Sequence, residues 1–173
     1  MSSFSVELNK KRICRYVFAS HLWDTRVNGF GEAVSVLLDT GSFNTVIHES
    51  LVEHRGFMHD VTMRVSVAGF SGDARICELH KLKIGNREFE KVVALVVPFD
   101  GELKNHILLG ANVTNNWKFT VSREENLLNV TEQFSTAARE RKYPYRYCFN
   151  SKGNIMAFQE FDHQGDNLHE QNA

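Results

Sequence analysis

Apolar residues along this chain recur at every second position or in short continuous runs, and turn residues separate the runs. This spacing is typical of β-strands, whose side chains alternate between two faces. The composition agrees, with 13 Phe and only 2 Pro among 173 residues. The pattern therefore predicts a mainly β fold, with strands at 14–19, 21–27, 33–38, 61–70, 74–84, 88–97, 118–121 and 127–130.

Glycine-containing turns join these strands into hairpins. Asn-Gly at 28–29 is a strong hairpin signal, because both turn positions favour positive φ. Gly-Phe-Ser-Gly at 69–72 predicts the tip of a second hairpin, and Gly-Asn at 85–86 predicts a third tight turn. The run at 92–97 is continuously apolar, so we expect that strand to be buried on both faces.

Other segments lack this alternation. Apolar Leu51 and Val52 among charged neighbours, with Gly56 just beyond, predict a short helix at 48–55. A second short helix is predicted at 111–117. Beyond residue 131 the pattern of apolar and polar residues changes. Two apolar runs, at 143–149 and 155–161, flank a polar turn. We interpret these two runs as an extra hairpin appended to the main domain.

A length of 173 residues fits one domain with an appended segment. We assign residues 12–131 to the domain, residues 132–161 to the segment that carries the extra hairpin, and residues 162–173 to a disordered polar tail. A chain of this size buries enough apolar surface for a stable core without disulfides or metals.

Charge argues against some partners. Lys and Arg total 20 against 21 Asp and Glu, so the net charge is −1 and no global field attracts nucleic acid or an anionic membrane. No apolar stretch is long enough for a membrane span, and the first residues lack the pattern of a signal peptide. We therefore expect a cytoplasmic protein with neither a nucleic-acid nor a membrane partner.

Three cysteines, Cys14, Cys77 and Cys148, stand far apart and form no CxxC pair. An odd number at wide spacing fits neither a disulfide framework nor a zinc site. We expect reduced thiols in the core.

The most informative stretch is 36–42, Val-Leu-Leu-Asp-Thr-Gly-Ser. It places Asp39 at the end of a buried strand and follows it with Gly41, which leaves room for backbone N–H groups to approach the carboxylate. Asp-Thr-Gly alone also occurs by chance as a solvated turn. Thr45 nearby and the run Ile-Leu-Leu-Gly at 107–110 favour a functional loop instead.

With these features the chain resembles a retropepsin-like aspartic protease over roughly residues 12–131. This family is the single-lobe, retroviral-type relative of pepsin. The resemblance implies a closed β-barrel, the acid protease fold, with short helices. The residues that carry it are the loop Asp39, Thr40, Gly41 and Ser42 with the following Thr45, Val46 and Ile47, the flap hairpin around Gly69, Phe70, Ser71 and Gly72, and the element Leu108, Leu109 and Gly110.

The resemblance also implies roles for these residues. Asp39 is the catalytic acid, and the Thr40 hydroxyl bonds across a dimer below the catalytic pair. Gly41 donates its N–H to the carboxylate, and Ser42 bonds the outer carboxylate oxygen. The flap, Gly69 to Gly72, closes over an extended peptide.

Two positions depart from the family pattern. Asn112 stands where many relatives carry Asp, and Phe70 stands at the flap tip where pepsin-like enzymes use Tyr. Neither change removes a catalytic group.

Peptide hydrolysis of this kind needs two carboxylates, because one accepts a proton from water while the other donates one to the amide oxygen. Asp39 is the only Asp in an Asp-[Ser/Thr]-Gly context. The second carboxylate must therefore come from another copy, in a two-fold dimer. The sequence predicts a homodimeric aspartic endopeptidase acting on peptide or protein substrates without a cofactor.

Two alternatives stay open. The same dimer can bind an extended peptide or partner protein without cleaving it, because an Asp loop shows capability and not turnover. In the other alternative, residues 132–173 provide the function of a structural adaptor.

Competing motifs are weaker. His48 and Glu49 begin like the zinc motif HExxH, but position 52 is Val, so we expect no metal site and interpret His48 and His54 as solvated helix residues. Aromatic residues alternate along 143–149, which is typical of a packed hairpin face and not of a platform for bases.

Overall fold

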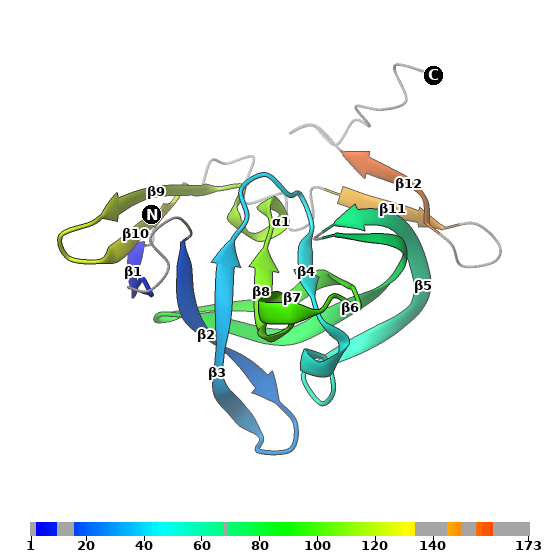
Figure 1. Ribbon diagram of the computed structural model, residues 1–173, viewed down its shortest axis with the longest axis horizontal. Coiled ribbons are helices and arrows are strands. Elements are labelled where there is room, and N and C mark those ends of the chain that lie inside the picture. The colour runs from blue at the N-terminus through cyan, green and yellow to red at the C-terminus, as the bar shows by residue number, and fades with distance from the viewer. Residues whose placement is uncertain (1–2, 10–15, 68, 134–144, 150–154, 161–173) are drawn as a thin grey trace.

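The chain folds around a seven-stranded mixed sheet (Figure 1). The computed structural model describes residues 3–9, 16–67, 69–133, 145–149 and 155–160. In sheet order the strands are β2 (Val17–Asp24), β3 (Gly29–Leu38), β8 (His106–Leu109), β4 (Thr45–Ile47), β7 (Arg87–Val96), β6 (Phe70–Ile84) and β5 (Gly56–Val67).

The sheet closes on itself because β2 also pairs with β6, where His21 lies opposite Lys83 and Leu22 opposite Leu82. Six of the seven strands therefore form a closed barrel, and β5 extends beyond it as the outer strand of the β5–β6 hairpin. Closure leaves these strands without free edges. The predicted mainly β closed barrel is confirmed.

The strand order near the middle of the sheet positions the site. β8 runs parallel to β3, with Leu38 opposite Leu109, and antiparallel to β4, with Val46 opposite Leu108. β8 thus separates two strands that follow each other in the sequence. The loop that joins β3 to β4, residues 39–44, must therefore cross the end of β8.

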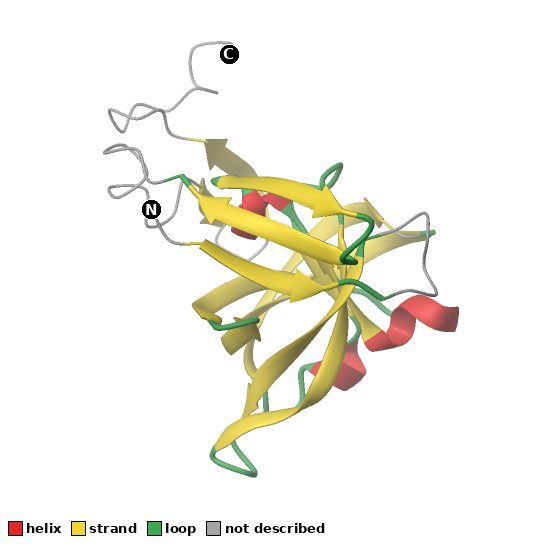
Figure 2. Cartoon of the chain, turned by 90° about the vertical axis from the view of Figure 1, so that its left-hand side faces the viewer, coloured by secondary structure: helices red, strands yellow, loops and turns green. Residues whose placement is uncertain are grey.

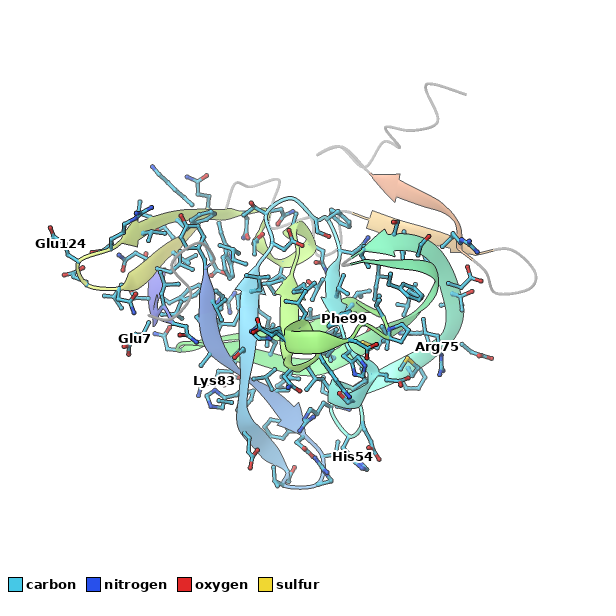
Figure 3. All side chains as sticks on the ribbon, viewed as in Figure 1. Glu7, His54, Arg75, Lys83, Phe99 and Glu124 are labelled. Atoms are coloured by element: carbon cyan, nitrogen blue, oxygen red, sulfur yellow. The ribbon has the colours of Figure 1, made fainter. Side chains whose placement is uncertain are left out.

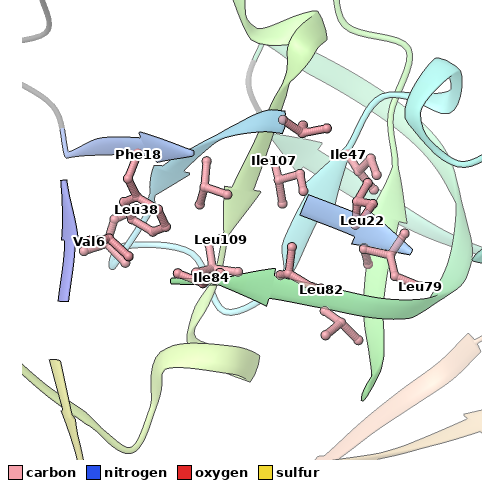
Figure 4. Packing of buried hydrophobic residues seen from close by; sticks show 14 of the residues in the cluster. Val6, Phe18, Leu22, Leu38, Ile47, Leu79, Leu82, Ile84, Ile107 and Leu109 are labelled. Carbon is pink, nitrogen blue, oxygen red and sulfur yellow. The ribbon is translucent and has the colours of Figure 1, made fainter. Parts of the chain in front are cut away.

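The main core fills the barrel with side chains from every part of the sheet. Leu38, Leu82, Ile84, Ile107 and Leu109 belong to this cluster (Figure 4). A second buried cluster contains Val46, Ala74, Ile76, Leu95, Val97, Phe99 and Leu108. The two clusters share β7: Ala94 joins the first and Leu95 the second, so the predicted burial of this strand on both faces is confirmed.

A small three-stranded sheet covers one end of the barrel and faces the viewer in Figure 2. Its order is β1 (Ser3–Glu7), β10 (Leu127–Glu132) and β9 (Trp117–Ser122). β9 and β10 occupy the expected positions. The sequence analysis began the domain at residue 12 and did not anticipate β1, whose Phe4 and Val6 enter the main core.

The hairpin turns differ in detail from the sequence patterns. The β2–β3 turn occupies residues 25–28; Asn28 has φ +49°, whereas Gly29 opens β3 and lacks the expected positive φ. The β5–β6 hairpin closes more tightly than the predicted tip at 69–72, because Val67 already pairs with Phe70, and Gly69 has φ +80°. The 85–86 turn is confirmed, with Gly85 at φ +59°.

The predicted helix at 48–55 is wrong. Only the 3-10 turn η1 (Glu49–Leu51) forms, and His48 is buried instead of solvated. Its ring nitrogen Nδ1 accepts the Ser50 N–H and its ring packs edge-on against Phe99, which draws it inward. His54 is exposed, as expected, but lies in a turn with φ +62° (Figure 3).

The remaining helices are short: η2 (Gly101–Asn105) and α1 (Ala111–Thr114). The second predicted helix ends early because Trp117 starts β9 and pairs with Glu132. Among the residues that the structure describes, no helix has the length and apolar character needed to cross a membrane.

The appended hairpin consists of β11 (Tyr145–Phe149) and β12 (Ile155–Glu160), paired antiparallel. Predictions for its side chains and for residues 162–173 fall outside the described residues. Cys77 is fully buried and free, and burial raises the pKa of its thiol to about 12, which confirms the expected core thiol there. Cys14 and the Cys148 side chain also lie outside the described part.

Candidate active site

Asp39 follows β3 directly and is half-buried at the end of the strand. Its backbone N–H donates to the carbonyl oxygen of Leu109, 3.0 Å away, so the end of β3 is tied to the end of β8. Val36 and Leu38 anchor the strand in the main core, whereas Leu37 packs against the second cluster. The second half of β3, with alternate residues buried, thus carries the carboxylate to the edge of the barrel.

The loop after Asp39 turns sharply around Gly41. The Ser42 N–H donates to the Asp39 carbonyl at 3.3 Å, and Thr40 and Gly41 are exposed. A Cβ placed on Gly41 would lie 3.8 Å from Asp39 Oδ1. The loop therefore passes close to the carboxylate, as expected from the sequence.

Two expected contacts of the carboxylate are absent from the described residues of this single chain. Ser42 Oγ donates to the carbonyl of Asn44 at 3.0 Å, so its one proton is not available to Asp39. No hydrogen bond joins the Gly41 N–H to the carboxylate among the residues described. Thr40 is exposed in this chain.

Gly110 allows the segment after β8 to press against this loop. A Cβ at this position would lie 2.4 Å from the carbonyl carbon and oxygen of Asn44, closer than real atoms approach. The glycine is required here for space and not for its φ, which is −91°. Its N–H donates to Thr45 Oγ1 at 3.2 Å.

Sequence reasoning missed a polar junction beside the loop. Asn112 Oδ1 accepts from the N–H and the hydroxyl of Thr45, at 3.0 and 2.7 Å, and Asn112 Nδ2 donates to the carbonyl of Val93 at 2.8 Å. Thr45 and Asn112 are 67 positions apart. The sequence placed Thr45 near Asp39 and Asn112 near Gly110, which was the available signal for a role at the site. Only the fold shows that the two side chains contact each other.

The flap hairpin lies on the same side of the sheet as Leu37. Val67 and Phe70, which flank the hairpin turn, pack against the same cluster as Leu37, two residues before Asp39. The Phe70 ring lies along its own strand, since a Cβ on Gly72 would meet its Cζ at 2.8 Å. The hairpin's apolar face and the Asp39 end of β3 thus share one cluster. Ser71 lies in β6, opposite Ser66.

The buried carboxylates elsewhere are already paired with arginines. Arg26 makes two side-chain hydrogen bonds to Asp24, at 3.0 and 2.6 Å, and Arg55 lies 3.5 Å away. Hydrogen bonding from Arg26 holds the pKa of Asp24 well below its usual range, despite the opposing effect of burial. Glu132 pairs with Arg87 at 2.8 Å.

Metal chemistry finds no support in the described residues, where no three His, Cys, Asp or Glu side chains gather around a possible ion. His48, the first residue of the incomplete zinc motif, uses Nδ1 to cap η1. Its partners are thus structural.

Comparison with known proteins identifies the family. A family model described as aspartyl protease matches residues 23–113, just over half of the chain. The chain belongs to the aspartyl protease family, which confirms the family expected from the sequence. No curated protein matches the chain. Among solved structures, it is similar to a retropepsin-like aspartic protease from Rickettsia conorii, with 18% identity, a TM-score of 0.48, and coverage of 75% of this chain and 90% of that chain.

Proposed function

We propose that this protein is a homodimeric aspartic endopeptidase, in which Asp39 from each of two chains activates a water molecule. The observation that carries the proposal is the placement of Asp39: a half-buried carboxylate on a rigid strand end, followed by an exposed loop and held by Leu109. Family membership supports the reaction class.

Two carboxylates are needed because water must lose a proton as the amide oxygen gains one. At close range two carboxylates do not both ionise readily, so the pair shares one proton. One Asp39 then acts as base and the other as acid. When the C–N bond of the tetrahedral intermediate breaks, the former base gives the proton that it took from water to the leaving amine, and the former acid regains a proton from a hydroxyl of the intermediate.

A second chain supplies the other carboxylate, because Asp39 is the only Asp of the sequence in an Asp-[Ser/Thr]-Gly context. Asp24 and Glu132 are the buried carboxylates of the described residues, and each is paired with an arginine. A two-fold axis through the exposed loop brings the same residue to both sides of the site. In that dimer we expect the hydroxyl of the exposed Thr40 to bond across the axis.

The substrate is an extended peptide held beneath the β5–β6 hairpin. Residues 70–72 begin β6 directly after Gly69, and strand addition to such a segment supplies backbone hydrogen bonds. Closure of the hairpin excludes water from the reacting bond. The apolar side chains on this face, including Val67 and Phe70, favour apolar substrate residues near the cleaved bond.

The test is incubation of the purified full chain with a diverse peptide mixture, with new termini identified by mass spectrometry. We expect cleavage by the wild type and a loss of at least about a thousandfold in Asp39→Asn, which keeps the side chain's size but not its basicity. Light scattering checks that the variant stays dimeric. Cleavage by Asp39→Asn at the wild-type rate would contradict the mechanism, and peptide binding without cleavage by either protein would favour the non-catalytic binding dimer.

A further inference from the structure

The Asn112 side chain lies at a junction between three segments. It is the second residue of α1, and it bonds to Thr45 at the start of β4 and to the carbonyl of Val93 in β7. Thr45 is fully buried, and its hydroxyl also accepts the Gly110 N–H. The four hydrogen bonds form one connected network.

The chemistry of the partners fixes which end of the amide faces which partner. The Thr45 N–H only donates, so it requires the Asn112 oxygen, and the Val93 carbonyl only accepts, so it requires the Asn112 nitrogen. An ionised carboxylate at position 112 would satisfy Thr45 but would set a negative oxygen against the carbonyl of Val93. The site therefore selects Asn over ionised Asp.

The same region holds the loop that carries Asp39. The Asn112 N–H donates to the Phe43 carbonyl at 2.9 Å, and the Ala111 N–H donates to the Ser42 carbonyl at 2.9 Å. Ser42 in turn donates its N–H to the Asp39 carbonyl. The segment 39–45 is thus bonded to residues 109–112 at its two ends, Asp39 and Thr45, and at Ser42 and Phe43 between them.

We propose that Asn112 is a positioning residue for Asp39, and that its amide fixes the catalytic loop against β7 and β8 in the geometry that the dimer needs. The proposal rests on the proposed function. The neutral amide of Asn112 both accepts from Thr45 and donates to Val93, whereas a carboxyl group at this position can do both only when it is protonated.

The decisive variant is Asn112→Asp, because protonation restores the missing donor. At acidic pH the introduced carboxyl group donates its proton to the Val93 carbonyl while its other oxygen accepts from Thr45. At higher pH it ionises and repels that carbonyl. The direct partners are uncharged. The titratable residues around them are Glu78, which pairs with Val93 from β6, His48 after β4, Lys91 in β7 and Asp39 itself.

We expect kcat of Asn112→Asp to approach the wild-type value at acidic pH and to fall about a hundredfold below it as pH rises, with a much smaller change in KM. The alkaline side of its rate profile therefore moves to lower pH. Asn86→Asp is the matched control, because it adds the same charge in the exposed turn between β6 and β7 and should leave the profile unchanged.

A second pair of variants tests the same network without a new charge. Thr45→Val removes the hydroxyl shared by Asn112 and Gly110, and Thr45→Ser keeps it. We expect Thr45→Val to lose kcat while Thr45→Ser retains most of it. Light scattering and the thermal unfolding midpoint identify the fraction of each variant that is folded and dimeric, and rates are compared for that fraction.

The outcomes separate the two proposals. A folded, dimeric Asn112→Asp with the wild-type rate profile would overturn the positioning role, even if Asp39→Asn is inactive and the proposed function holds. Cleavage by Asp39→Asn at the wild-type rate would overturn the proposed function, and the positioning role with it. An acid-shifted profile in Asn112→Asp alone, with Asn86→Asp unchanged, supports the positioning role.

Discussion

The backbone N–H of Asp39 donates to the carbonyl of Leu109 at 3.0 Å and joins the residue that follows β3 to the last residue of the parallel strand β8. These strands are far apart in the sequence, and each has its buried face in the barrel core. The candidate catalytic carboxylate therefore depends on the closed barrel and not on the Asp-Thr-Gly turn alone. Substitutions in the segment after Leu109 should therefore alter the position of Asp39.

Gly110→Ala should destabilise the protein, because the added methyl group has no room beside the backbone of Asn44. Overpacking costs about 1–3 kcal/mol, and a contact with backbone belongs at the upper end of that range. Denaturant unfolding measures the change.

Gly29→Ala is the control for that substitution, since its nearest neighbour would be the Val27 carbonyl at 3.8 Å, an ordinary contact. Its free energy of unfolding should change by less than about 0.5 kcal/mol. Equal losses in the two variants would show that Gly110 is not needed for space.

Asp24→Asn should lower stability at neutral pH, with a gap to the wild type that begins to narrow as the pH falls below about 4. Hydrogen bonding from Arg26 holds the pKa of Asp24 well below its ordinary value of 3.8. A lowered pKa means that the ionised form is favoured by folding, so its contribution is complete above the ordinary value and is lost as pH falls toward the folded-state pKa. Thermal unfolding followed by circular dichroism between about pH 3 and 7 measures the gap.

Asp73→Asn provides the comparison for the Asp24 series. Asp73 lies 3.8 Å from Arg64 and both side chains are largely exposed, so the pair is expected to contribute less than about 1 kcal/mol. A gap for Asp24→Asn that persists unchanged to the lowest pH would contradict the assigned ion pair.

Peptide cleavage should show an optimum on the acidic to near-neutral side, because the pair works with one carboxylate ionised and the other protonated. The rate should fall on both sides of that optimum. Initial rates on one identified peptide, measured in overlapping buffers, give the profile. A rate that still climbs above about pH 9, or activity that a chelator removes, would point to a metal-bound hydroxide or another base instead.

Local patterns in the sequence predicted much of the fold. Alternation placed most strands, and the continuous apolar run in β7 predicted its burial on both faces. Errors arose where distant contacts decide the structure. The sequence around His48 predicted a solvated side chain, but the residue is buried because its ring packs against Phe99 and caps η1. β1 forms because β10 offers a partner for its backbone.

The site follows the same division. Asp39 was identified from its own loop and the hydrophobic strand before it, because its environment is encoded locally. Asn112 was noted only as a departure from a pattern, since its role depends on Thr45 and Val93, which no spacing rule brings to it. Ser42 was assigned to the carboxylate, whereas the bend of the loop turns its hydroxyl to Asn44.

The most direct test of the central claim is a mixing titration of the wild type with Asp39→Asn, at total concentrations that saturate dimerisation and after subunit exchange. If the two chains share one site, a wild-type chain that pairs with the variant is inactive. At a ninefold excess of variant, random pairing predicts that cleavage per wild-type chain falls about tenfold. Cleavage per wild-type chain that stays constant across the titration would show that each chain holds a complete site, and would contradict the dimer of Asp39 residues.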